Sequence, residues 1–143
     1  MSGRRHAVKL AADANVLLSA LIGGRARLAL THPSLEEVVT TQHTFSEVEE
    51  YSTILAKNKR LPVDLMLLAV AALPVIVIER SHYAADLPEA VRLIGRRDSD
   101  DVERLALALH LRIPLWSNDK DFQHLGIELF TTERLLRHLA IIH

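Results

Sequence analysis

Short apolar runs alternate with longer segments of helical period along the whole chain. Five runs are short, continuous and largely apolar or β-branched, as in strands that are buried on both faces. They lie at 7–12, 38–41, 75–78, 113–117 and 127–131. Between and after them, helical spacing is found at 16–22, 25–31, 45–59, 62–73, 83–95, 99–111 and 132–142. Strands separated by helices predict an α/β fold with a central parallel sheet of about five strands, covered on both faces.

Length and composition narrow the class of protein. A chain of 143 residues with 49% hydrophobic content suits one domain, 1–143, with a sizeable core. The absence of cysteine excludes a disulfide scaffold, a zinc–thiolate site and a cysteine nucleophile. The longest apolar stretch, 65–78, contains Pro74 and is too short to span a membrane. No signal peptide precedes it, so we expect a soluble cytoplasmic protein without membrane contact.

The first candidate for chemistry is Asp13, which ends the first predicted strand. Aspartate is among the best helix N-caps, and a junction between strand and helix is where a cap belongs. The same position would also present a carboxylate at the sheet edge where ligands of open parallel sheets bind. Both interpretations stay open at this point.

A second acid, Glu47, lies near the start of the 45–59 helix. Thr44 with Glu47, or Ser46 with Glu49, would form a capping box. On a helical wheel, Glu47 lies about 70–80° from the centre of the apolar stripe, whereas Glu49 lies about 120–140° away. Glu47 is therefore the acid of this helix that we expect closest to the core. The stripe consists of Phe45, Val48, Tyr51, Ile54 and Leu55.

Two further acidic groups follow, at a helix start and after a strand. Asp98, Asp100 and Asp101 open the 99–111 helix, where negative charge complements the macrodipole. Asp101 lies about 90° from the centre of the apolar stripe of this helix, and Asp100 points nearly opposite. Asp119 and Asp121 follow the 113–117 strand, in a loop that could be an ordinary Asn- and Asp-rich turn.

Convergence of these acids would require either a cation that neutralises them or protons shared between them. Two like charges 4 Å apart cost about 4 kcal/mol at an effective dielectric constant of 20. Ligand sets made only of oxygen favour hard ions such as Mg²⁺ or Mn²⁺. Such an ion can activate water for phosphodiester hydrolysis, which leads from this pattern to a nuclease.

Four motifs resemble the PIN domain, the nuclease fold of VapC-like toxins of toxin–antitoxin pairs. They are ADANVLLSAL, TFSEVEEYSTIL, RDSDDVERLALALHL and PLWSNDKDF, and together they span most of the chain. The resemblance implies a three-layer α/β/α sandwich, Mg²⁺ or Mn²⁺ at the carboxylates, and RNA cleavage that leaves a 3′-hydroxyl and a 5′-phosphate. It also implies a homodimer and a small antitoxin partner.

The resemblance assigns roles to individual residues. The four catalytic and metal-binding acids are Asp13, Glu47, Asp101 and Asp119. Supporting residues or alternate ligands are Asn15, Asp98, Ser117 and Asp121. Ala14 stands where a hydroxyl residue usually follows the first aspartate, so this chain lacks that hydroxyl beside the metal.

An RNA substrate needs basic contacts around the acidic centre, because phosphate neutralisation supplies most of the affinity. The same residues could instead be solvated helix ends. The candidates are Arg25, Arg27, Lys57, Lys59, Arg60, Arg96, Arg97 and Lys120.

Other functions fit the sequence less well. A phosphatase would place a second aspartate two residues after the first, where this chain has Asn15. The alternative from another class is a non-catalytic PIN-like or receiver-like module that binds RNA or a protein.

Overall fold

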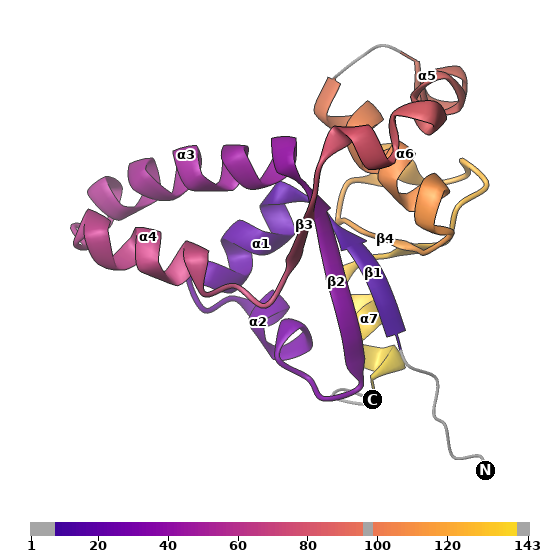
Figure 1. Ribbon diagram of the computed structural model, residues 1–143. Coiled ribbons are helices and arrows are strands. Elements are labelled where there is room, and N and C mark those ends of the chain that lie inside the picture. Colours follow the sequence, from indigo (N-terminus) through magenta and orange to yellow (C-terminus); the bar gives the residue numbers. More distant parts are fainter. Residues whose placement is uncertain (1–7, 96–98, 140–143) are drawn as a thin grey trace.

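The computed structural model describes residues 8–95 and 99–139. Five parallel strands form one sheet in the order β3-β2-β1-β4-β5 (Figure 1). The central strand is β1 (Val8–Ala12), flanked by β2 (Leu35–Thr41) and β4 (Leu115–Trp116). The edges are β3 (Ile76–Ile78) and β5 (Leu129–Phe130). The predicted parallel sheet of five strands is confirmed.

The two C-terminal strands are shorter than predicted, although their pairing reaches further. Ala11 donates its backbone N–H to the carbonyl of Pro114, and Ser117 donates to the carbonyl of Phe130. Pro114 has no N–H of its own and so cannot complete a strand ladder. Predicted and observed strands therefore differ only in where regular pairing ends. Both segments, 113–117 and 127–131, are placed as strands of the sheet.

Helices cover both faces of the sheet and form two hydrophobic cores. Leu10 and Ala12 of β1 face the core that contains α1 (Ala14–Leu21), α2 (Arg25–Leu30) and α7 (Thr132–His138). Ala11 faces the opposite core, with residues of α5 (Leu87–Ile94) and α6 (Ser99–Leu111). Because alternate side chains of one strand enter different cores, both faces of β1 are apolar. The molecule is a three-layer α/β/α sandwich.

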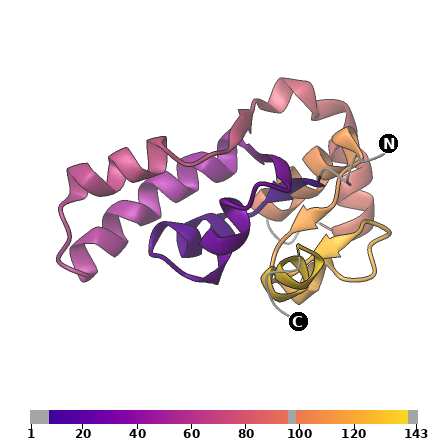
Figure 2. The same ribbon diagram turned by 90° about the horizontal axis from the view of Figure 1, so that it is seen from below.

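A pair of helices, α3 (Gln42–Asn58) and α4 (Val63–Ala71), extends side by side from the sheet (Figures 1 and 2). Thr41 caps α3 by accepting the backbone N–H of Thr44, so the two predicted capping boxes are wrong. The predicted apolar stripe is also partly wrong, because Tyr51 and Ile54 are exposed. The fully buried positions of α3 are instead small or β-branched, which suits a helix packed between close neighbours: Thr44, Val48, Ser52 and Ala56.

The segment 83–95 was predicted as one helix and is divided. Two short 3-10 turns, η1 (Arg80–His82) and η2 (Ala84–Asp86), precede α5 (Leu87–Ile94). Pro88 explains the division, because proline is tolerated only in the first turn of a helix. The next helix, α6 (Ser99–Leu111), has the predicted bounds. Within the described residues, no helix is long and apolar enough to cross a membrane.

Candidate active site

Asp13 lies at the carboxyl end of β1 and is 3% exposed. Its Oδ1 accepts the backbone N–H of Val16 at 2.9 Å, so Asp13 is indeed the N-cap of α1. Its Oδ2 accepts a hydrogen bond from the hydroxyl of Ser117, at the end of β4. One carboxylate oxygen thus fixes the local turn, and the other joins two neighbouring strands.

The position of Asp13 coincides with the switch in strand order. From β1 the chain adds β2 and β3 on one side, and it then returns to place β4 on the other side of β1. In open parallel sheets, ligands bind outside the carboxyl ends of strands at such a point. Asp13 follows β1 and Ser117 follows β4, and these are the two neighbouring strands at this switch point.

Asp119 belongs to the loop that follows β4. Its backbone N–H donates to Ser117 Oγ at 3.0 Å, and its Oδ1 accepts the N–H of Asp121 at 2.8 Å, at the start of η3 (Lys120–Phe122). The side chains of Asp119 and Asp121 are exposed. The turn geometry expected of an Asx-rich loop is therefore present, and it leaves Asp119 at the surface beside Ser117.

A basic residue that the sequence analysis did not single out joins Glu47 and Asp101. Arg104 donates from Nη1 to Asp101 Oδ1 at 2.9 Å and from Nη2 to Glu47 Oε1 at 3.0 Å. Its Nε donates to Thr44 Oγ1 at 3.4 Å. The side chains are 11% exposed for Arg104, 12% for Asp101 and 24% for Glu47. The sequence signal was an arginine three residues after Asp101, at the start of the apolar run of that helix.

Electrostatics connects these two groups of residues. Burial raises the pKa of Asp13, and the charge of Asp119 raises it further. The Ser117 hydroxyl, the Val16 N–H and the positive charge of Arg104 oppose that rise and lower the pKa. Asp13 therefore senses both Asp119 and Arg104, although no direct hydrogen bond joins it to either among the described contacts.

The two helical-wheel predictions are confirmed. Glu47 is half-buried, whereas Glu49 and Glu50 are exposed. Asp101 is buried, with 8% of the whole residue exposed. The neighbouring Asp100 turns to the other side of α6 and contacts His43 of α3. The tertiary packing of α3 against α6 then decides what these acids meet.

A second polar cluster, also missed from the sequence, includes Glu103, the residue before Arg104 on α6. Glu103 is buried and accepts a hydrogen bond from the hydroxyl of Tyr83, which is fully buried. Arg80 Nε lies 3.1 Å from the other carboxylate oxygen of Glu103. Burial, followed by the hydrogen bond to Glu103, raises the pKa of Tyr83. The pattern at 99–111 gave no sign of this pair, because Tyr83 comes from a distant segment.

The other predicted residues are placed as follows. Asn15 is exposed and borders a cavity of about 390 Å³ that also touches Glu47. Lys120 is exposed beside Asp119. Arg27 bonds the carbonyls of Ala20 and Leu21 at the far end of α1 from Asp13, and Arg25 begins the next helix. Arg96, Arg97 and Asp98 lie outside the described residues.

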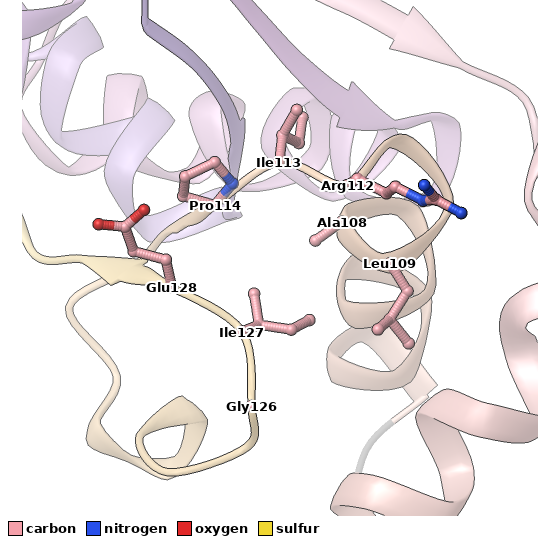
Figure 3. Close-up of a pocket in the computed structure, with 8 residues that line it drawn as sticks. All are labelled: Ala108, Leu109, Arg112, Ile113, Pro114, Gly126, Ile127 and Glu128. Atoms are coloured by element: carbon pink, nitrogen blue, oxygen red, sulfur yellow. The ribbon is translucent and has the colours of Figure 1, made fainter.

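One surface cavity, shown in Figure 3, is lined by residues other than these acids. Its volume is about 290 Å³, and Ile113 and Pro114 line it just before β4 begins. Leu109 and Ile127 add further apolar surface, and Glu128 is its one acid. It lies at the amino end of β4, whereas Ser117 and Asp119 follow the carboxyl end, so it has no part in the acidic group.

The chemistry of the donor set suits a hard divalent cation. Asp13, Glu47, Asp101 and Asp119 offer carboxylate oxygens only, as Mg²⁺ and Mn²⁺ prefer. Among the described residues, no three acidic or histidine side chains are already grouped as a metal site. Glu47 and Asp101 are instead bound to Arg104. The donors fit, and the guanidinium holds two of them.

Comparisons with known proteins agree on the fold. A sequence model of the PIN domain matches residues 12–140. No curated protein sequence matches. Among solved structures, a toxin–antitoxin complex from Klebsiella pneumoniae is 20% identical, with a TM-score of 0.64, and covers 86% of this chain and 97% of that chain.

Two further structures are similar to this chain. PAE2754 from Pyrobaculum aerophilum is 20% identical, with a TM-score of 0.63 over 95% of this chain and 98% of that chain. Mycobacterium tuberculosis VapC20, a toxin that cleaves the sarcin–ricin loop, is 21% identical. Its TM-score is 0.56 over 82% of this chain and 95% of that chain.

Proposed function

Because the chain belongs to the PIN domain family, we propose that it is a divalent-metal-dependent ribonuclease and the toxin of a toxin–antitoxin pair. The observation that carries the proposal is that contacts and charge link these acids around the strand switch point. Asp13 is joined to the Asp119 loop through Ser117, and its pKa responds to Arg104, which binds Glu47 and Asp101. Ser117 and Arg104 thus connect acids from four separate segments.

Asp13, Glu47, Asp101 and Asp119 would hold Mg²⁺ or Mn²⁺. A divalent ion held there would supply Lewis acidity and charge neutralisation for phosphodiester hydrolysis. The chain contributes orientation: the Val16 N–H and the Ser117 hydroxyl fix both oxygens of Asp13. Asn15, Asp121 and the alternate Asp98 are supporting residues in this proposal.

The proposed reaction adds water to the phosphorus atom and breaks the bond to the 3′ oxygen. The products are a 3′-hydroxyl and a 5′-phosphate. Lys120, which is exposed and follows Asp119 in the chain, would contact a phosphate in this proposal. Contacts by Arg25, Arg27, Arg96 and Arg97 stay predictions. An RNA substrate is supported by the similarity to VapC20, a toxin that cleaves the sarcin–ricin loop.

A protein partner is also part of the proposal. The paired helices α3 and α4 expose several large apolar side chains, including Tyr51, Ile54, Leu65 and Leu68. Exposed apolar patches of this kind support contact with another protein. We assign a small antitoxin and a second copy of the chain as partners, a cytoplasmic location, and a single domain over residues 1–143.

The test compares two glutamates of one helix. Glu47→Gln should reduce Mn²⁺-dependent cleavage of a mixed-sequence RNA at least about tenfold, since even residues that only support metal ligands cost this much. Glu49→Gln, two residues away and exposed, should cleave like the wild type. EDTA should abolish cleavage by both. Equal activity of the two variants would refute the site. The absence of cleavage, together with no metal-induced rise in melting temperature, would favour the binding-module alternative.

A further inference from the structure

Arg104 is the one described cation that touches two of the proposed metal-binding acids. Its guanidinium bonds Asp101 from one nitrogen and Glu47 from another. Its third nitrogen reaches Thr44, so all three guanidinium nitrogens have partners. At 11% exposure, this arrangement is held inside the protein rather than on its surface.

The positive charge of Arg104 is placed between two carboxylates. Nη1 lies 2.9 Å from Asp101 Oδ1, and Nη2 lies 3.0 Å from Glu47 Oε1. Without such a charge, carboxylates collected near one another would repel strongly. Arg104 therefore supplies, for Glu47 and Asp101, part of the neutralising charge that a bound cation would supply.

Arg104 and a divalent ion would compete for the same carboxylates. The guanidinium bonds one oxygen of each, Asp101 Oδ1 and Glu47 Oε1, and fixes their orientation. A divalent ion draws its ligand oxygens to about 2.0–2.6 Å from a single point. An ion bound by both carboxylates would therefore lie close to the positive charge of Arg104, which opposes its binding.

We propose that Arg104 is a resident countercation that competes with the divalent ion for Glu47 and Asp101 and so sets the metal affinity of the site. The inference rests on the proposed function, because it assumes that these acids bind metal. Arg104 is a positioning residue in this account: it keeps Glu47 and Asp101 together in the metal-free protein. Its bonds to Glu47 and Asp101 weaken when metal binds.

Metal binding by Arg104→Met provides the first test, with Mn²⁺ as the probe in isothermal titration and thermal-shift measurements. The variant should bind Mn²⁺ at least about tenfold more tightly than the wild type, the factor equivalent to one charge-assisted hydrogen bond. Its metal-free melting temperature should fall, and its metal-induced rise should grow. Arg92→Met removes an exposed arginine paired with Glu89 on α5 and should change none of these values.

Two further measurements test the proposal even if Arg104→Met does not fold: a second variant, and a resonance of Arg104 in the wild-type protein. Arg104→Lys keeps the charge but cannot bond two carboxylates with a rigid fork. Its Mn²⁺ affinity should therefore lie between that of the wild type and that of Arg104→Met. In the wild type, the side-chain Nε–H resonance of Arg104 should move on saturation with Mg²⁺. A purely structural role for Arg104 predicts a still resonance and no gain in affinity.

The outcomes separate the two proposals. If the wild type binds metal and both Arg104 variants bind it no more tightly, the competition is refuted while the metal site stands. If only the variants bind Mn²⁺ measurably, the competition is supported, and RNA cleavage decides the proposed function. If none of the proteins binds metal, both proposals fail.

Discussion

The hydrogen bond from Ser117 to Asp13 makes the sharpest stability prediction. Ser117 is fully buried and donates to a carboxylate that is 3% exposed, while its Oγ also accepts the N–H of Asp119. Ser117→Ala removes both contacts and leaves Asp13 Oδ2 without this donor. A hydrogen bond to a charged group contributes about 1.5–3 kcal/mol to the free energy of unfolding. For a chain of this length, that loss corresponds to a fall in melting temperature of about 5–12 °C.

The loss should also depend on pH in a defined direction. Ser117 lowers the pKa of Asp13, which means that its hydroxyl favours the ionised carboxylate. Acidification protonates Asp13 and weakens that preference, so the difference in melting temperature should be larger at pH 8 than at pH 4.5.

Ser52→Ala is the matched control for this experiment. Ser52 is equally buried, but its hydroxyl donates to the carbonyl of Glu49 within its own helix, at 2.8 Å. Its removal leaves no charge without a partner, so we expect a loss within about 1 kcal/mol. Differential scanning calorimetry of the three proteins measures both effects. Equal losses for the two serine variants, or no loss for Ser117→Ala, would refute the reasoning.

The remaining predictions concern two buried titratable side chains, those of Asp13 and Tyr83. Burial raises the pKa of Asp13 above 3.8, so the folded state binds its proton more tightly and stability from this group falls as pH rises above that value. Asp13→Asn should fold, lose cleavage and lose this part of the pH dependence, and a melting curve series with an unchanged pH slope would contradict it. Tyr83→Phe should cost about 1.5–3 kcal/mol, because Glu103 loses a buried donor. Since the pKa of Tyr83 is raised from 10.0, wild-type stability should fall as pH rises above 10, whereas that of Tyr83→Phe should fall less; parallel denaturant midpoints across this range would count against the pair.

The sequence was sufficient for the order of the elements and the parallel sheet. Continuous apolar strands between helical segments leave few arrangements, and the five strands lie where the pattern placed them. The exceptions have local causes that a hydrophobic pattern underweights. Pro88 limits where α5 can start, and the cap of α3 is Thr41, which also ends a strand.

The buried face of α3 is a different kind of error. A helical wheel ranks residues by apolarity, and it therefore selected Tyr51 and Ile54, which are exposed. In the folded protein, burial depends on which side chains fit against the neighbouring elements. The buried residues of α3 include Thr44, Ser52 and Ala56. The same wheel was right for Glu47 and Asp101, because the angular position of a residue on a helix depends only on its number.

By itself, the sequence determined which acids stand at strand ends and helix starts, and which of them turn toward the protein interior. These properties follow from the local period of the chain and from its caps. Only the tertiary structure decided which groups meet. Ser117 reaches Asp13 because β4 lies beside β1, and Arg104 reaches Glu47 because α6 packs against α3. The contact of Arg104 with Glu47 spans 57 positions of the sequence, and that of Ser117 with Asp13 spans 104. Contacts over such separations depend on the packing of whole elements, which no local pattern encodes.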